Sequence, residues 1–490
     1  MNKVLAFDFG ASSGRAILST YENGKLTLDE IHRFSNDPVM VHGTFYWDIL
    51  RLFFEIKQGI LKCVNSGNGD ITSISIDTWG VDFGLLDADG RLLENPVHYR
   101  DARSQGMMEE VCKLISQNEI YEKTGIQFVD INTIYHLYSL KKNRPEILDR
   151  AETLLFIPDL FAYMLTGQMN VEYTIASTSQ LLNAEKRDWD YDLIQRLGFP
   201  KKLFKPVQEP GNIIGRISKD IADELGIAQI DVIACGSHDT ASAVVAAPIK
   251  KGERSCYISC GTWSLLGAEI DKPLINASSF QYNFTNEGGY ENTIRFLKNI
   301  SGLWILQETR RQWIREGDNI SFKDIDKMLL TENSANVYID PDYEPFSKPG
   351  NMPVKINAYL QATGQNLPQT KGQVALCILE SLAMTYRYYI EQLEKILGEK
   401  MDVVHLIGGG TKDVNLCRFT ANVTGKKVTA GPTEATAIGN IVVQLISQGA
   451  IADMAEGRTL SDDLKTYMPE NSIMWEQKYQ QFLKYKGMVK

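Results

Sequence analysis

The sequence contains no long apolar run and few cysteines. Its longest uncharged stretch, residues 435–452, includes Asn440, Gln444 and two glycines, which is typical of a packed helix rather than a membrane span. Near the start, Asp8 interrupts the apolar residues, so no signal-peptide core is present. The seven cysteines are odd in number and lack the paired spacing of a zinc site, which favours free thiols. These absences predict a soluble, cytoplasmic protein.

The chain also lacks an excess of positive charge. Its 51 basic and 61 acidic side chains give a net charge of -10. The composition therefore shows no excess of basic side chains that would attract nucleic acid or an anionic membrane. It has no low-complexity tract or short repeat, which makes disorder or a fibrous structure improbable. Its 490 residues, 43% of them hydrophobic, are enough for several domains with cores of their own.

Two common nucleotide-binding motifs are missing. The absence of GxxxxGK[ST] disfavours a P-loop. The glycine run at residues 408–410 is not the GxGxxG dinucleotide fingerprint. Any phosphate site in this chain must therefore be built differently.

Two segments far apart in the chain show the same strand pattern. In the first, strands are predicted over residues 4–10, 15–21 and 25–34. In the second, they are predicted over residues 254–260 and 263–269. This repetition predicts a duplicated α/β architecture.

The later part of the chain supports an α/β class. A strand over residues 403–407 leads into the three glycines and then a helix over 413–423, as in a βαβ unit. We therefore predict two domains, residues 1–247 and residues 248–490, with a ligand cleft between them.

The turn after the first predicted strand, DFGASSGR at residues 8–15, is built of small residues. Such a turn gathers backbone N–H groups that can hold a phosphate, while Ser12 and Ser13 add hydroxyls and Arg15 adds charge. Asp8 at the strand end is placed to hold hydrated Mg²⁺. A plain hairpin turn uses the same residues, so the pattern alone leaves both interpretations open.

Two further turns are weaker candidates. Gly261-Thr262 occupies the matching place in the second half and offers backbone donors and one hydroxyl for a phosphate chain. The glycines at 408–410 would let a flat ring or a phosphate lie on bare backbone. Each is also typical of an ordinary tight turn.

A polar triplet, Ser237-His238-Asp239, follows an apolar run and precedes a helix of small residues. Aspartate at such a junction is either a helix N-cap or a catalytic carboxylate, and the pattern alone favours the cap. His238 is either structural or a donor to substrate. Adjacent residues cannot adopt the geometry of a Ser-His-Asp triad, so a hydrolase is disfavoured.

Residues 77–83, DTWGVDF, and 99–103, YRDAR, place a tryptophan, a glycine and polar heads close together. An aromatic face with carboxylates and guanidinium groups suits a sugar. The spacing alone favours the simpler interpretation, a core tryptophan with surface ion pairs.

Taken together, these segments resemble the FGGY carbohydrate-kinase family over nearly the whole chain. The resemblance implies an α/β fold of two duplicated ribonuclease-H-like, actin-like ATPase domains with an interdomain catalytic cleft. The matching segments are DFGASSGR (8–15), DTWGVDF (77–83), YRDAR (99–103), GIQF (125–128), EYTIAST (172–178), SHDTASAV (237–244), GTWSL (261–265), TNEGG (285–289), LKNISGLWILQ (297–307), GGG (408–410) and AGPTEATAIGN (430–440).

The resemblance implies an ATP- and Mg²⁺-dependent kinase that phosphorylates the C1 hydroxyl of L-rhamnulose in L-rhamnose catabolism. Two alternatives stay open: a kinase for another ketose, such as L-fuculose or L-xylulose, and a non-catalytic sugar- or nucleotide-binding protein. Asp239 and both phosphate turns count against the second. We expect sugar and ATP as partners, neither nucleic acid nor membrane, and leave the oligomeric state open.

Specific roles also follow from the resemblance. It implies that Asp239 is the proton acceptor and that Asp8 lies near Mg²⁺. The implied sugar-binding residues are Gly80, His238, Asp239, Thr240 and Asn299. The implied ATP-binding residues are Ala11, Ser12, Ser13, Gly14, Arg15, Thr262, Gln307 and Gly409.

Overall fold

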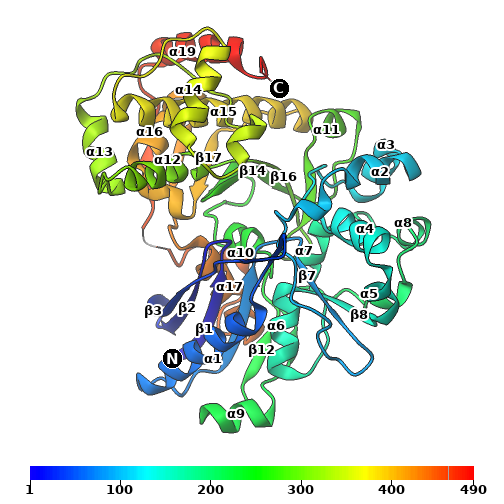
Figure 1. Cartoon of the computed structure of the whole chain (residues 1–490). Coiled ribbons are helices and arrows are strands. Elements are labelled where there is room, and N and C mark those ends of the chain that lie inside the picture. Colours follow the sequence, from blue (N-terminus) through cyan, green and yellow to red (C-terminus); the bar gives the residue numbers. More distant parts are fainter. Residues whose placement is uncertain (462, 490) are drawn as a thin grey trace. The chain divides into compact units, whose positions relative to one another are not determined.

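The computed structural model describes residues 1–461 and 463–489, which form two compact units of sheet and helix (Figure 1). The predicted α/β class is confirmed. The first unit comprises residues 1–246, 269–296 and 435–461, and the second comprises residues 247–268, 297–434 and 463–489. The first unit thus includes two segments from the second half of the sequence. A linear boundary between residues 247 and 248 stays a prediction.

The first unit is built on a six-stranded sheet in the order β11-β12-β6-β1-β2-β3. β1 is antiparallel to β2 and parallel to β6, so Asp8 lies opposite both Arg15 and Asp77. The predicted opening meander is confirmed. The strands are β1 Asn2–Phe9, β2 Ser13–Glu22, β3 Lys25–Ser35, β6 Ser73–Thr78, β11 Ile213–Arg216 and β12 Asp231–Ile233.

One face of this sheet is apolar and packs against helix α1 (Ile49–Asn65). The closest approach is at Gly59, where a Cβ atom would lie 2.7 Å from Phe7 and 2.9 Å from Ala16. Glycine at this position therefore lets the helix sit directly on the strands.

The opposite face is polar and packs against helix α17 (Ala435–Ser447). Asn440 Nδ2 donates to Asp77 Oδ2 at 2.7 Å, and Ser73 Oγ donates to Gln444 Oε1 at 2.6 Å. These hydrogen bonds replace those that the buried polar groups would otherwise make with water. The helix predicted within residues 435–452 is confirmed.

Helix α10 (Asp239–Val245) crosses α17 at very short range. A Cβ atom on Gly439 would lie 1.7 Å from the carbonyl oxygen of Ser242, so only glycine fits. This crossing fixes the position of α10, whose first residue is Asp239.

Shorter elements complete the first unit. Its other helices are α2 Met107–Leu114, α3 Gln117–Thr124, α4 Thr133–Asn143, α5 Pro145–Arg150, α6 Ile157–Thr166, α7 Tyr173–Ala176, α8 Tyr191–Arg196, α9 Lys219–Leu225, α11 Ala277–Gln281 and α18 Met454–Gly457. Its other strands are β4 Val39–Val41, β5 Thr44–Tyr46, β7 Phe83–Leu86, β8 Thr153–Phe156, β9 Leu182–Asn183, β10 Asp188–Trp189 and β15 Thr285–Gly288, and β16 (Ile294–Ser301) begins in it.

The second unit contains the strand order β14-β13-β17-β18-β19. β13 is antiparallel to β14 and parallel to β17, which repeats the pairing of β1 with β2 and β6. The predicted second meander and βαβ unit are confirmed. The strands are β13 Ser255–Cys260, β14 Trp263–Ile270, β17 Val403–Ile407, β18 Lys427–Ala430 and β19 Lys465–Tyr467, and the helices are α12 Trp304–Arg315, α13 Phe322–Thr331, α14 Met352–Ala362, α15 Lys371–Leu397, α16 Val414–Thr424 and α19 Ser472–Tyr485.

Two of the predicted absences concern the chain as a whole. In the part that the structure describes, no helix combines the length and the apolar character needed to cross a membrane. All seven cysteines, six of them buried, are free thiols, as predicted.

Candidate active site

Asn36 stabilises the small-residue turn between β1 and β2 through two hydrogen bonds. Gly10 N donates to Ser13 O at 3.0 Å and closes the turn. Asn36 Nδ2 donates to Gly10 O at 2.9 Å, and Asn36 N donates to Ser12 O at 3.1 Å. Ser12 is exposed at the tip, where its hydroxyl can reach an anion.

Packing against β3 requires glycine at position 14. A Cβ atom there would lie 2.3 Å from the ring of Phe34 on β3. Glycine is therefore required at position 14 for the packing of β2 against β3. Contact of Gly14 with ATP stays a prediction, and it would have to be made by the backbone.

Three carboxylates and one guanidinium gather beside this turn. Arg15 Nη2 donates to Asp8 Oδ2 at 2.5 Å. Asp77 is fully buried, and its Oδ1 has no hydrogen-bond partner among the described residues. Burial raises the pKa of Asp77 well above its usual value, and the charges of Asp8 and Asp239 raise it further. Even with Asp77 protonated, the two carboxylates of Asp8 and Asp239 outnumber the single guanidinium of Arg15.

This cluster fits a magnesium ion held mainly by water and phosphate. The described residues contain no group of three or more acidic, histidine or cysteine side chains that could hold a metal by themselves. Mg²⁺ needs only one or two carboxylates when phosphates and waters supply its other ligands. The unpartnered oxygen of Asp77 and the excess negative charge are consistent with a cation nearby, so Asp8 stays the candidate ligand.

Asp239 begins helix α10 without capping it. The N-cap position belongs to His238, so the N-cap interpretation of Asp239 is wrong. Asp239 Oδ1 accepts from Thr240 Oγ1 at 3.0 Å and lies 3.5 Å from His238 Nε2. Its side chain stays 30% exposed, within reach of a substrate. Burial raises its pKa, His238 opposes that rise and Asp8 adds to it, which makes the carboxylate a better proton acceptor.

Gly80 lies close against the His238 ring. A Cβ atom on Gly80 would lie 3.2 Å from Thr178 and 3.3 Å from His238 Nε2. The next residue, Val81, has φ 67, a conformation that a β-branched side chain rarely adopts. Two hydroxyls hold Val81 there, since its N–H donates to Thr178 Oγ1 at 3.1 Å and its carbonyl accepts from Thr133 Oγ1 at 2.7 Å. Such strain is typical of a functional loop.

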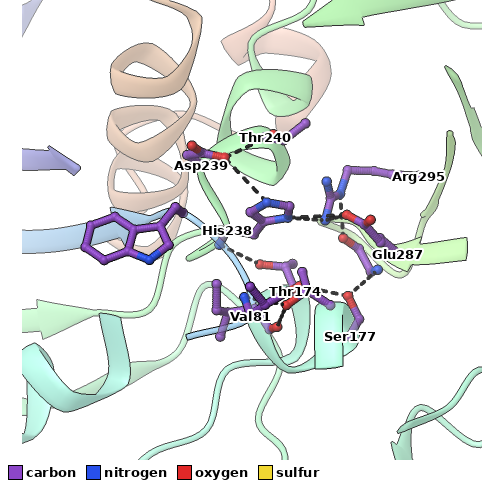
Figure 2. A network of polar contacts seen from close by, with 12 residues as sticks. Val81, Thr174, Ser177, His238, Asp239, Thr240, Glu287 and Arg295 are labelled. Atoms are coloured by element: carbon purple, nitrogen blue, oxygen red, sulfur yellow. Dashed lines mark hydrogen bonds and ion pairs between the residues drawn. The ribbon is translucent and has the colours of Figure 1, made fainter. Parts of the chain in front are cut away.

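Behind His238 lies a buried ion pair (Figure 2). Arg295 Nη2 lies 3.1 Å from His238 Nδ1 and 3.2 Å from Glu287 Oε2. Glu287 Oε2 also lies 3.3 Å from His238 Nδ1. His238 therefore has charged neighbours on both ring nitrogens.

Trp79 is a core residue. It is 5% exposed, and its Nε1 donates to Asp82 Oδ2 at 2.9 Å. Trp47 Nε1 donates to the same oxygen at 2.6 Å. Burial raises the pKa of Asp82 to about 7, although the two indole donors oppose the rise. The simpler interpretation of the DTWGVDF segment is confirmed for this tryptophan.

In the second unit, the structure brings Thr262 and Gln307 together. Thr262 Oγ1 donates to Gln307 Oε1 at 3.5 Å, and Trp304 N donates to Thr262 O at 3.2 Å. Helix α12 therefore starts directly on the turn. Asn299 lies on the part of β16 in this unit and is half-buried.

The three glycines after β17 have three different environments. Gly408 has φ 83, in the left-handed region that favours glycine. A Cβ atom on Gly410 would lie 2.3 Å from Cys260 Sγ, whereas a Cβ atom on Gly409 would meet nothing within 4 Å. Of the three, Gly409 is thus the one whose bare backbone faces open space.

Comparison with known proteins matches both halves of the chain to one family. The models of the N-terminal and C-terminal domains of the FGGY family of carbohydrate kinases match residues 3–246 and 256–448. The chain belongs to the FGGY family of carbohydrate kinases.

Similar proteins cover almost the whole of this FGGY family member. The rhamnulokinase of Oceanobacillus iheyensis is 45% identical over 94% of this chain and 97% of its own. The rhamnulokinase of Bacteroides thetaiotaomicron is 43% identical over 97% of this chain and 98% of its own. The crystal structure of gluconate kinase from Lactobacillus acidophilus shares the fold, with a TM-score of 0.81 at 18% identity over 99% of this chain and 97% of the other.

The structure of this FGGY family member thus places the predicted residues in two groups. Asp8, residues 11–15, Gly80 and residues 238–240 lie in the first unit, and Thr262, Asn299, Gln307 and Gly409 lie in the second. Their roles as ligands stay predictions.

Three neighbours of this site were not predicted as site residues: Asp77, Glu287 and Arg295. Asp77 lies in the segment DTWGVDF, but its pairing with Asp8 across parallel strands gave no sequence signal. Glu287 lies in the segment TNEGG. Arg295 gave no sequence signal.

Proposed function

We propose that this protein transfers the γ-phosphoryl group of ATP to the C1 hydroxyl of L-rhamnulose, giving L-rhamnulose 1-phosphate and ADP. Membership of a carbohydrate-kinase family supports the reaction class. Relatives named rhamnulokinase, 43–45% identical over nearly the whole chain, support the substrate. The same evidence favours L-rhamnulose over L-fuculose or L-xylulose.

One observation carries the chemistry: Asp239 is a partly exposed carboxylate with a raised pKa, 3.5 Å from His238 Nε2. The C1 oxygen forms a bond to the γ-phosphorus while the bond to the leaving ADP breaks. The hydroxyl proton passes to Asp239. Gly80, His238, Thr240 and Asn299 would orient the sugar for this attack.

Phosphoryl transfer has a loose transition state, so the protein's main tasks are alignment and charge neutralisation. Backbone N–H groups and hydroxyls of Ala11, Ser12, Ser13 and Gly14, with the charge of Arg15, would hold phosphate oxygens. Thr262, Gln307 and Gly409 would bind ATP from the second unit. Asp8 would hold Mg²⁺, which when bound neutralises phosphate charge.

We also propose the wider setting of this reaction. Residues 1–247 would serve as the domain for sugar and the first phosphate turn, and residues 248–490 as the nucleotide domain. The enzyme would act in the cytoplasm, in L-rhamnose breakdown.

A coupled ADP-release assay tests the proposal. L-rhamnulose, L-fuculose and L-xylulose are compared, with sugar-free and magnesium-free controls, and ³¹P NMR of the product identifies the phosphorylated carbon. We expect the highest kcat/KM with L-rhamnulose and a C1 phosphate ester. A higher kcat/KM for another ketose would reassign the substrate, and no sugar-dependent ADP would favour a binding protein.

A further inference from the structure

Two charged groups lie close to Nδ1 of His238. One can hydrogen-bond to this nitrogen only when it is unprotonated, and the other only when it is protonated. Arg295 Nη2 lies 3.1 Å from Nδ1 and can only donate, so it requires Nδ1 to be bare. Glu287 Oε2 lies 3.3 Å from Nδ1, and as a carboxylate it accepts, so it requires Nδ1 to carry hydrogen. The two contacts cannot both be hydrogen bonds (Figure 2).

The geometry favours Arg295. Its contact to Nδ1 is the shorter of the two and meets the geometry of a hydrogen bond. Arg295 is 0% exposed, and a guanidinium offers hydrogen-bond donors only. Its Nη2 also lies 3.2 Å from Glu287 Oε2, so the carboxylate has a cationic neighbour without a proton from the imidazole. Nδ1 is therefore the acceptor, and the ring proton resides on Nε2.

The position of that proton matters for the attacking hydroxyl. Nε2 lies 3.5 Å from the partly exposed Asp239 Oδ1 and beside Gly80, where a Cβ atom would be 3.3 Å from it. An N–H at Nε2 donates to the oxygen of a hydroxyl placed there, which leaves the hydroxyl's own hydrogen free to point at Asp239. With the opposite tautomer, the lone pair of Nε2 would compete with Asp239 for that hydrogen.

We propose that Arg295 is a positioning residue that fixes His238 as its Nε2–H tautomer, so that the sugar hydroxyl presents its proton to Asp239. This inference rests on the proposed function, because it assumes that a sugar hydroxyl binds beside His238 Nε2 and Asp239. Neither Arg295 nor Glu287 needs to touch the substrate.

A purely structural role for Arg295 is the rival explanation, since its Nε donates to Gly288 O at 2.7 Å. Gly288, however, is also held by other groups. Its N–H donates to Ser177 Oγ at 2.8 Å, and a Cβ atom on it would lie 2.4 Å from the ring of Tyr173. Loss of the Arg295 side chain should therefore leave Gly288 in place.

The test removes both members of the pair, R295M/E287Q, so that no buried charge is left alone. The matched control is R458M/E269Q, another largely buried pair of the first unit, with Arg458 Nη2 2.7 Å from Glu269 Oε2. We expect R295M/E287Q to lose about 100-fold in kcat/KM for the ketose, the scale of a misplaced reacting group. The KM for ATP should match that of the control.

Nitrogen NMR of ¹⁵N-histidine-labelled protein reads the tautomer directly, with the signals of His238 assigned by their loss in H238Q. We expect a protonated Nε2 and a bare Nδ1 in the unaltered protein, and a mixture or the reverse in R295M/E287Q. A protonated Nδ1 in the unaltered protein would overturn the inference. So would unchanged ketose kinetics in a folded R295M/E287Q.

The outcomes also separate this inference from the proposed function. If the unaltered enzyme phosphorylates no ketose, the proposed function fails while the NMR spectrum still decides the tautomer. If R295M/E287Q does not fold, the spectrum of the unaltered protein alone decides.

Discussion

The two strand–turn–strand openings of the chain have the same backbone plan. In the first unit, Gly10 N donates to Ser13 O at 3.0 Å between β1 and β2. In the second, Gly261 N donates to Trp263 O at 2.8 Å between β13 and β14. In both, the leading strand also has a parallel neighbour, β6 or β17.

The side chains at matching positions differ in charge. Beside the first turn, Asp8 lies opposite Arg15 and forms an ion pair with it. Beside the second, the matching positions hold Ser259 opposite Leu265, and neither side chain carries a charge. One backbone plan can therefore support charged chemistry in one place and neutral anion contacts in another.

The largest expected effect comes from neutralising the proposed base of the first unit, Asp239. D239N keeps the shape of the side chain but cannot accept a proton, so kcat should fall about 10³-fold, within the range for general-base catalysis. Calorimetry should still detect sugar binding. A coupled assay measures kcat.

The second unit offers a matched control, because Asp413 caps helix α16 through Leu416 N at 2.8 Å. Asparagine caps as well as aspartate, so D413N should keep kcat within about twofold. Retention of near-normal turnover by D239N would remove Asp239 from its proposed role.

The next effect concerns the charge beside the first turn. D8N should lower kcat about 100-fold and raise the Mg²⁺ concentration for half-maximal activity about tenfold, because one anionic ligand is lost. Its counterpart S259A removes a hydroxyl at the matching position of the second unit and should leave the magnesium dependence unchanged. Identical magnesium titrations for D8N and the unaltered enzyme would contradict the assignment of Asp8.

A smaller effect separates two adjacent glycines. G410A should lower the free energy of unfolding by about 1–3 kcal/mol, since its Cβ would lie 2.3 Å from Cys260 Sγ. G409A meets no atom and should change stability by less than about 0.5 kcal/mol, yet raise the KM for ATP. Urea denaturation and ATP kinetics measure the two effects. Equal losses of stability would show that Gly409 is structural too.

The last comparison concerns the pH dependence of stability. Burial raises the pKa of Asp82 and of Glu172 to about 7. Between about pH 4 and pH 7 the unfolded chain ionises these groups while the folded chain keeps their protons, so stability should fall as pH rises through this window. Each group contributes up to about 1.4 kcal/mol per pH unit.

E172Q should flatten this part of the profile in thermal melts from pH 5 to pH 8. Glu394 in the second unit provides the contrast, because Lys400 and Lys426 outweigh the effect of burial and lower its pKa. Its contribution is lost only as pH falls below the ordinary range of a carboxyl. If stability depends on pH as steeply in E172Q as in the unaltered protein, Glu172 is not a source of this pH dependence.

The sequence was informative where structure is set by neighbours in the chain. The meanders around Gly10 and Gly261, and the helix of residues 413–423, follow from local periodicity and turn residues. The same local logic failed at Asp239, since the N-cap position belongs to His238.

Contacts between distant segments gave no local signal. Asp77 meets Asp8 only through the register of β1 against β6, and Arg295 meets His238 across 57 residues. The pattern predicted α17 as a buried helix but could not show that it packs on the sheet of the first unit. Such pairings depend on tertiary packing, which residue spacing does not encode.

The hydrogen bond from Asn440 to Asp77 also bears on the synthesis of the chain. It joins residues 363 positions apart, so the polar face of the first sheet is covered late. At about 5–20 residues per second, a ribosome needs roughly 20–70 s to make that interval. During that time the nascent sheet holds Asp77 without its partner. Asp8 and Asp77, which lie beside the proposed base, are therefore made early, and their environment is completed late.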